Sequence, residues 1–156
     1  MLRSLFLVFV ASLGLFGQKY TGPQPEKADL PDLIQADVLV PTEATEAKEE
    51  NRKDDIIFVV DGATSSAATP LASPAFLIRT DQLVADKLQV YRLELKNGRR
   101  EILFSHKKKQ VARPVSCTAS RVGDDLYKLE VDVSLGKGEY SITPDGSNQV
   151  FCFRVY

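Results

Sequence analysis

Hydrophobic and polar positions alternate through much of the chain after residue 56. Residues 126–133 place an apolar side chain at every second position, whereas residues 56–60 and 75–80 are short apolar runs between polar segments. Alternation is typical of a half-buried strand, and a short apolar run is typical of a fully buried one. About eight such segments, with turns between them, indicate a mainly β chain. We therefore predict a single antiparallel β-sandwich over residues 56–156.

Residues 89–105 contain the clearest local signal, two apolar-patterned strands on either side of an Asn-Gly pair at 97–98. An Asn-Gly pair in this position predicts a β-hairpin with a type I′ turn. Pairing Lys96 with Arg99 places most apolar side chains of both strands on one face. A shift by one residue would move them to the opposite face, so this register is the predicted one.

Leu135, Gly136 and Tyr140 stand just before a predicted strand. Their arrangement resembles the tyrosine corner of immunoglobulin-like sandwiches. Two features depart from that pattern, because the chain contains no Trp and Ile142 stands where a second core Cys would follow Tyr140. We therefore expect an immunoglobulin-like sandwich in architecture only, and architecture alone does not define a function.

The first 17 residues have the form of a secretory signal peptide. Arg3 is the only charged side chain before Lys19, and residues 4–17 form an apolar run. As a helix that run would measure roughly 21 Å, which is shorter than the roughly 30 Å hydrocarbon core of a bilayer. We expect a secreted or periplasmic protein. An uncleaved membrane anchor is the alternative, because a cut after Gly17 would place Leu15 where a small residue is preferred.

Residues 18–55 form an acidic, proline-containing lead-in to the predicted sandwich. Residues 26–55 alone carry ten acidic and four basic side chains, a net charge of −6. Such a composition buries little apolar surface, so we expect the lead-in to be partly disordered or draped over the sandwich. Residues 42–53 are prone to form a short helix, with Thr42 as its N-cap. The apolar side chains of the lead-in that are able to dock are Leu30, Leu33, Ile34, Val38, Leu39 and Val40.

The two cysteines, Cys117 and Cys152, leave two alternatives open. In an oxidising compartment a pair of cysteines usually forms a disulfide, which would contribute about 4 kcal/mol to the stability of this fold. However, Cys152 lies on the face opposite Phe151 and Phe153, whereas Cys117 shares the apolar face of its own segment with Val115. Adjacent strands would need both thiols on the same face. The second alternative is therefore two buried free thiols.

Most side-chain arrangements used in catalysis are missing from the sequence. His106 is the single histidine and no G-x-S-x-G motif accompanies it, so a Ser or Cys nucleophile lacks a positioned base. A zinc site would need several His or Cys ligands, and the acidic pairs match no calcium-binding loop. Gly136 and Gly138 lack the strand–helix context of a phosphate-binding loop. We predict that the protein is not an enzyme and binds no cofactor or metal.

Charge is balanced along the whole chain, with 20 basic and 21 acidic residues, which excludes a chain-wide basic field for nucleic acid. Residues 92–113 are the exception, because they carry a net charge of +6. This region is a candidate docking surface for a polyanion, such as an anionic envelope polymer or lipid headgroups. Two structural roles also account for this charge and are the preferred explanations: protection of an edge strand by lysine, or attraction to the acidic lead-in of the same chain. The eight cations are Arg92, Lys96, Arg99, Arg100, Lys107, Lys108, Lys109 and Arg113.

Four stretches carry a resemblance to known proteins, namely PTEATEAKEENRKDD, ATSSAATPLASPAF, KNGRRE and GEYSITPDGSNQVFCF. They are similar to a group of uncharacterised, predicted-secreted bacterial proteins with a C-terminal immunoglobulin-like β-sandwich domain. The resemblance covers roughly residues 27–156. It implies export and a β-rich domain in which the acidic lead-in is a regular part, and it implies no activity and no residue roles.

These observations favour a non-catalytic exported binding or structural module that acts through protein–protein contacts in the bacterial envelope or exterior. Loops or an exposed edge strand of the sandwich would bind the partner. The alternative is a polyanion- or carbohydrate-binding module that uses residues 92–113. We expect no nucleic-acid partner, and membrane contact only through an uncleaved leader. An exposed edge could equally pair with a second copy of the chain.

Overall fold

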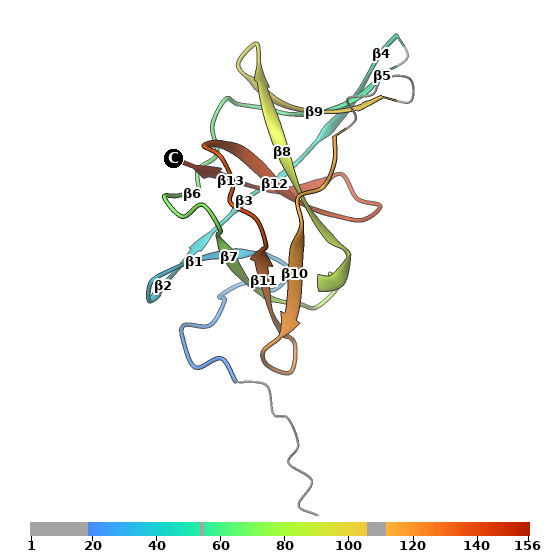
Figure 1. The fold of residues 1–156 in the computed structure, drawn as a ribbon. Coiled ribbons are helices and arrows are strands. Elements are labelled where there is room, and N and C mark those ends of the chain that lie inside the picture. Colours follow the sequence, from blue (N-terminus) through green and yellow to red (C-terminus); the bar gives the residue numbers. More distant parts are fainter. Residues whose placement is uncertain (1–18, 54, 106–111) are drawn as a thin grey trace, which may run out of the picture.

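The computed structural model describes residues 19–53, 55–105 and 112–156 (Figure 1). These residues form a five-stranded and an eight-stranded sheet, with one short 3₁₀ turn at Ala85–Lys87 and no α-helix among them. The mainly β class predicted from the sequence is thus confirmed. No helix in the described part of the chain is long and apolar enough to cross a membrane. The predicted signal peptide at 1–17 lies outside the described residues.

The smaller sheet has the strand order β10-β11-β7-β1-β2, and every neighbouring pair is antiparallel. Its two edges are therefore β10 and β2. In Figure 1 this sheet forms the lower part of the molecule. Its strands are β1 (Asp32–Gln35), β2 (Val38–Pro41), β7 (Ala75–Arg79), β10 (Cys117–Arg121) and β11 (Leu126–Val131).

The larger sheet has the strand order β3-β13-β12-β8-β9-β5-β4, and β6 pairs with β13 in the parallel direction. Its two edge strands are consecutive in the sequence, because only Ala47 separates β3 from β4. One pairs with β13 and the other with β5, so the sheet rolls back on itself. Its strands are β3 (Glu43–Glu46), β4 (Lys48–Arg52), β5 (Asp55–Val60), β6 (Ala68–Thr69), β8 (Leu88–Lys96), β9 (Arg99–Ser105), β12 (Gly138–Pro144) and β13 (Gln149–Val155).

The main hydrophobic core lies between the two sheets. Leu33 and Phe76 of the smaller sheet meet Ile142 and Phe153 of the larger sheet in this core, and all four are fully buried. The ring centroids of Phe76 and Phe153 are 4.9 Å apart in an edge-to-face contact. Two antiparallel sheets that share one core in this way are consistent with the predicted β-sandwich.

A second apolar cluster lies inside the rolled part of the larger sheet. It includes Val60, Tyr91, Ile102 and Cys152, which are all buried. Val59, the neighbour of Val60 on the opposite face of β5, is also only 1% exposed. Strand β5 is therefore buried on both faces, which explains why its sequence is a continuous apolar run rather than an alternating one.

The predicted hairpin forms in the predicted register. Lys96 pairs with Arg99 across the turn. Asn97 and Gly98 have φ angles of 53° and 71°, and a type I′ turn requires positive φ at both positions. The local sequence signal was sufficient here because a two-residue turn fixes the pairing of the strands that it joins.

The prediction of a short helix over residues 42–53 is wrong, because this segment forms β3 and β4. Strands β1 and β2 also come from the acidic lead-in, residues 18–55, which we call the acidic segment. Its strands join both sheets through the β1–β7, β3–β13 and β4–β5 pairings. A helix here would have buried only alanines. As strands, the same residues pair with the apolar strands β5 and β13, and this tertiary pairing overrides the local helix propensity.

Tyr140 forms the hydrogen bond that is expected of a tyrosine corner. Its hydroxyl donates to the Gly136 carbonyl at 2.7 Å, and the residue is only 2% exposed. Arg92 donates to the same hydroxyl at 2.9 Å and to the Lys137 carbonyl at 3.1 Å. These bonds attach the turn before β12 to the neighbouring strand β8.

Candidate functional site

Five of the eight predicted polyanion-binding cations lie within the described residues, and their environments differ. Two are paired with the acidic segment, and three line a hollow beside β8 and β9. The remaining three, Lys107, Lys108 and Lys109, lie outside the described residues together with His106.

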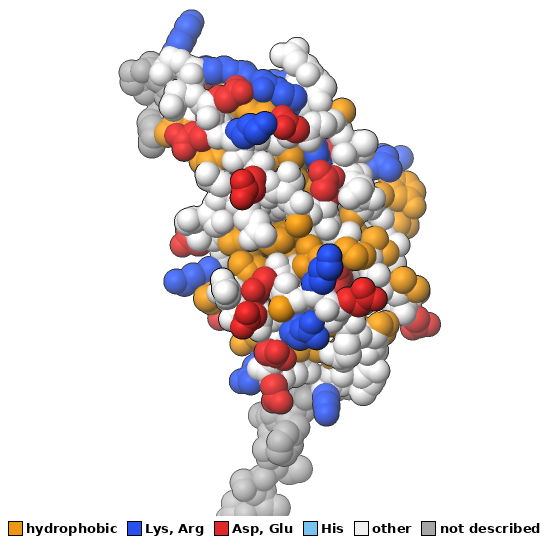
Figure 2. Space-filling model, turned by 180° about the vertical axis from the view of Figure 1, so that it is seen from behind, with side chains coloured by type: hydrophobic (Ala, Val, Ile, Leu, Met, Phe, Trp, Pro, Cys, Tyr) orange, Lys and Arg blue, Asp and Glu red, His pale blue; other side chains and the backbone are white. Residues whose placement is uncertain are grey.

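Arg99 and Arg100 of β9 pair with carboxylates of the acidic segment. Arg99 donates to Glu50 in β4 at 2.9 Å, and Arg100 donates to Glu43 in β3 at 2.9 Å. Figure 2 shows basic and acidic side chains next to one another over the upper part of the molecule, where β4 and β9 lie. For these two residues, the geometry therefore supports attraction to the acidic segment of the same chain.

Arg100 is almost completely enclosed, with 1% of its surface exposed. It also donates to the carbonyls of Asp61 and Gly62 at 2.7 and 2.9 Å and to the Ser65 hydroxyl at 2.8 Å. Ser65 in turn donates to the Glu139 carboxylate through both its N–H and its hydroxyl. The network attaches the loop after β5 to the larger sheet, and it leaves Arg100 inaccessible to an external anion.

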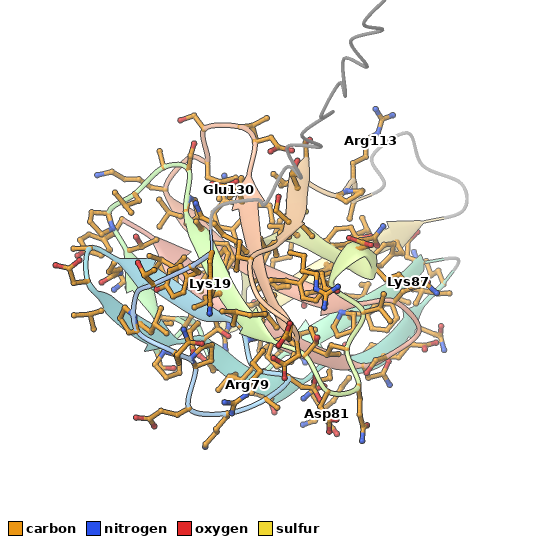
Figure 3. All side chains as sticks on the ribbon, turned by 90° about the horizontal axis from the view of Figure 1, so that it is seen from below. Lys19, Arg79, Asp81, Lys87, Arg113 and Glu130 are labelled. Atoms are coloured by element: carbon orange, nitrogen blue, oxygen red, sulfur yellow. The ribbon has the colours of Figure 1, made fainter. Side chains whose placement is uncertain are left out.

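Arg92, Lys96 and Arg113 line a common hollow of about 530 Å³ beside β8 and β9. Glu94 and Glu101 line the same hollow, so its charged groups include both signs. Lys96 lies 3.5 Å from Glu94, whereas Arg113 points away from the sheets (Figure 3). The structure thus brings three of the predicted cations together, but it places two acids among them.

Both cysteines are free, so the predicted alternative of a Cys117–Cys152 disulfide is not formed. Cys117 lies in β10 of the smaller sheet, and Cys152 lies in β13 of the larger one. Burial raises the pKa of the Cys152 thiol to about 12, and it also raises the pKa of Cys117. Both thiols are therefore less ionised near neutral pH than an exposed cysteine, which makes them weaker nucleophiles.

The surface around strand β2 carries several exposed apolar side chains. Val38 of β2 is 60% exposed. Leu71 is 47% exposed and Tyr156 is 56% exposed. Strand β6 lies close to the β1–β2 turn, because the Gln35 side chain donates to the Ala68 carbonyl at 2.6 Å. Figure 2 shows hydrophobic side chains gathered on the side of the molecule where β2, β6 and the C-terminus lie. The sequence indicated an exposed edge and apolar residues able to dock, but it did not indicate that β2 is that edge.

An acidic hollow of about 530 Å³ adjoins β2 on the outer face of the smaller sheet. Glu26, Asp32 and Asp37 line it together with Lys27. Asp32 belongs to β1, where its neighbour Leu33 points into the main core, so the Asp32 side chain points to the opposite face. We call this feature the Asp32 hollow. The sequence pattern does not indicate this hollow, because its lining comes from both an irregular segment and a hairpin.

Asp29 fixes the irregular segment that forms the other wall of the Asp32 hollow. Its carboxylate accepts backbone N–H bonds from Asp81, Gln82 and Leu83 at 2.8 to 3.1 Å. Although burial opposes the shift, these bonds hold the pKa of Asp29 below its usual value. Arg79 and Asp81 mark this side of the molecule in Figure 3.

A smaller cavity of about 240 Å³ lies beside the second apolar cluster. Phe58, Tyr91 and Phe104 line it, and the Phe104 ring lies edge-to-face with the other two at 5.5 and 5.6 Å between centroids. Gln89 and Asp145 add polar groups at its rim. An apolar wall with a few polar groups is the usual composition of a small-molecule site.

None of the protein-family models, curated proteins or solved structures matches the chain. Its function must therefore follow from the sequence pattern and from the geometry of the structure. That geometry defines a β-rich protein with an apolar free edge at β2 and an acidic hollow beside this edge.

Proposed function

We propose that the protein is a non-catalytic exported binding module that holds a partner protein by pairing an extended segment of the partner with β2. The predicted signal peptide at residues 1–17 supports export to the periplasm or exterior. The bond from the Tyr140 hydroxyl to the Gly136 carbonyl supports an immunoglobulin-like form of the sandwich. Strand pairing at such an edge combines backbone hydrogen bonds, which give affinity, with side-chain pockets, which give specificity.

The free edge of β2 is the observation that carries the proposal. The Thr42 N–H donates to the Pro31 carbonyl at 3.1 Å, which fixes the alternation of bonded and non-bonded pairs along β1 and β2. On this alternation Leu39 directs its N–H and its carbonyl away from β1, and Pro41 directs its carbonyl the same way. These groups face the free edge, where a strand from a partner can bond to them.

The side chains of β2 carry no charge that would protect the edge. Folded proteins protect an exposed edge with charged residues, with proline or by keeping the strand short; β2 has four residues and ends at Pro41, but it contains no charged residue. The other free edge of the smaller sheet, β10, is polar and ends at Arg121, and its Thr118 donates to Asp132 at 3.0 Å. An apolar edge beside further exposed apolar side chains is typical of an interaction site.

The test is a cross-linked pull-down from an envelope extract of the host, repeated at low and high salt. Val38→Lys places a charge on the edge and should leave folding intact, because this side chain is 60% exposed. Leu95→Lys is the matched control, because Leu95 is 59% exposed at the far end of β8. We expect one stoichiometric protein partner at both salt concentrations with the wild type and with Leu95→Lys, and its loss with Val38→Lys. Recovery that Val38→Lys leaves unchanged would overturn the assignment to β2.

The hollow lined by Arg92, Lys96 and Arg113 supports a second candidate function, the binding of an anionic polymer or carbohydrate. Exposed charges are screened by salt, so such binding should fall steeply between low and physiological ionic strength. Binding to an immobilised anionic polysaccharide should weaken in Arg113→Gln and persist in Arg121→Gln. A complex that does not respond to salt would contradict this function.

A further inference from the structure

We propose that the Asp32 hollow receives a lysine or arginine side chain from the segment that pairs with β2, and that the Asp32 carboxylate is its binding partner. This inference rests on the proposed function and specifies the partner's chemistry. The partner segment would carry apolar side chains along the strand and one cationic side chain at a fixed position.

The environment of the Asp32 carboxylate is the principal observation behind this inference. The residue is only 4% exposed, yet among the described residues its Oδ1 is the one buried side-chain oxygen or nitrogen that lacks a hydrogen-bond partner. A buried polar atom without a partner is costly, and native proteins contain few of them. Burial, and then the charge of Glu26, raises the pKa of Asp32 above its usual value. A donor that enters the hollow would remove this cost.

The charge of the hollow determines what that donor must be. The lining contains three acidic residues and one basic residue, so it carries an excess of negative charge. The acidic residues are Glu26, Asp32 and Asp37, and the basic residue is Lys27. Among the described residues, no three His, Cys, Asp or Glu side chains lie close enough together to hold a metal ion. An ammonium or guanidinium group is the alternative cation, because it needs only one or two carboxylates.

The strand register explains how a partner side chain would reach Asp32. Asp32 pairs with Pro41, and an added strand would lie one further strand spacing away. Two spacings amount to about 10 Å. A residue opposite Pro41 would project onto the same face as Asp32, because paired positions share a face. Only the long stems of lysine and arginine bring a charge across that separation.

A second copy of the chain does not meet these requirements. Its own β2, Val38–Pro41, contains no lysine or arginine that could enter the hollow. Pairing two copies through β2 would also bring two acidic hollows toward one another, which like charges disfavour. The geometry therefore favours a different protein as the partner.

The experiment is selection from a library of short random peptides displayed on phage, with the full chain as target. We expect the wild type to enrich peptides that alternate apolar residues and carry Lys or Arg at one position. Asp32→Asn should keep the apolar pattern and lose the cation, whereas Val38→Lys should lose all enrichment. Asp145→Asn, which removes an exposed carboxylate elsewhere, is the control and should behave as the wild type.

The possible failures are distinguishable. Enrichment that depends on Val38 but shows no fixed cation would overturn this inference and leave the proposed function intact. If Val38→Lys enriches the same peptides as the wild type, the proposed function fails and this inference fails with it.

A second measurement separates binding from folding effects. The pKa of Asp32, followed by NMR, should fall when the selected lysine peptide is added, because a nearby cation favours the ionised carboxylate. A peptide with norleucine in place of that lysine should bind about tenfold more weakly and leave the pKa unchanged. An equal fall with both peptides would overturn the assignment of Asp32. Glu26, Lys27 and Asp37 line the same hollow and must be followed in the titration.

Discussion

Arg100 in β9 and Glu43 in β3 form an ion pair across the inside of the rolled sheet, with 2.9 Å between Nη2 and Oε1. The two strands are not neighbours in the sheet. The pair therefore connects the predicted basic hairpin to the acidic segment through the interior, in addition to the strand pairing that joins β4 to β5. The acidic segment is thus held in the fold by both charge and backbone hydrogen bonds.

Arg100→Met should lower the free energy of unfolding by about 3 to 5 kcal/mol. The substitution removes the cation that pairs with Glu43 and bonds to Ser65, and it removes a positive charge that interacts with the buried Glu139. Urea unfolding measures the change. Arg99→Met is the control and should cost less than about 1 kcal/mol, because the Arg99–Glu50 pair is partly exposed to water and the buried Glu101, the second partner of Arg99, still pairs with Arg52. Equal losses of unfolding free energy in the two variants would show that the interior Arg100–Glu43 pair stabilises the fold no more than the partly exposed pair does.

Tyr140→Phe should cost about 1 kcal/mol of stability. The variant keeps the buried ring but loses the bonds to the Gly136 carbonyl and from Arg92. Thermal unfolding of Tyr140→Phe and of Tyr156→Phe gives the comparison. Tyr156 is 56% exposed, so its variant should match the wild type. An unchanged melting temperature in Tyr140→Phe would contradict a stabilising role for this hydroxyl.

The features that could be predicted from the sequence are those that short-range signals determine. The turn at Asn97 and Gly98 fixed the hairpin register, and the spacing from Gly136 to Tyr140 fixed a hydrogen bond within one turn. In both cases the interacting residues lie within a few positions of one another. Alternation identified the mainly β class for the same reason, since it reports on each strand separately.

The features that could not be predicted depend on distant pairings. Residues 43–52 have helix-prone side chains, and only their contacts with β5 and β13 make them strands. Arg100 belongs to a charged run, and its burial depends on the loop after β5. The burial of Asp32 depends on an irregular segment that covers one sheet face. Local patterns carry no information about which remote segment covers a residue.

Native alkylation should leave both cysteines largely unmodified near neutral pH. The thiolate is the reactive form, and burial raises the pKa of Cys152 to about 12 and raises that of Cys117 as well. Mass spectrometry after iodoacetamide treatment measures the reaction. Unfolding the protein without reductant should then expose both thiols to the reagent, since both are free. A chain that stays unmodified after unfolding would contradict this and indicate a disulfide.

Asp29→Asn should lower the free energy of unfolding at neutral pH by less than about 1 kcal/mol, because Asp29 is only partly buried and water screens its carboxylate. Although burial opposes the shift, N–H bonds from Asp81, Leu83 and Gln82 hold the folded-state pKa below the unfolded value. The stabilisation is therefore present above the unfolded pKa and is lost as the pH falls through the folded pKa. Unfolding curves over the acid range test this, with Asp81→Asn as the control. A difference from wild type that persists at the lowest pH would contradict the linkage.

Asp32→Asn should have the opposite effect and raise the stability at neutral pH. Burial, and then the charge of Glu26, raises the folded-state pKa of Asp32 above its unfolded value. Ionisation of Asp32 therefore costs stability once the pH rises through these pKa values, and below both of them the variant should match the wild type. Chemical unfolding at acidic and neutral pH measures the difference. A residue that lowers stability while it provides a binding group is expected at functional sites. If the variant is instead less stable at neutral pH, the carboxylate already has a stabilising partner within the fold, and no external cation is needed to satisfy it.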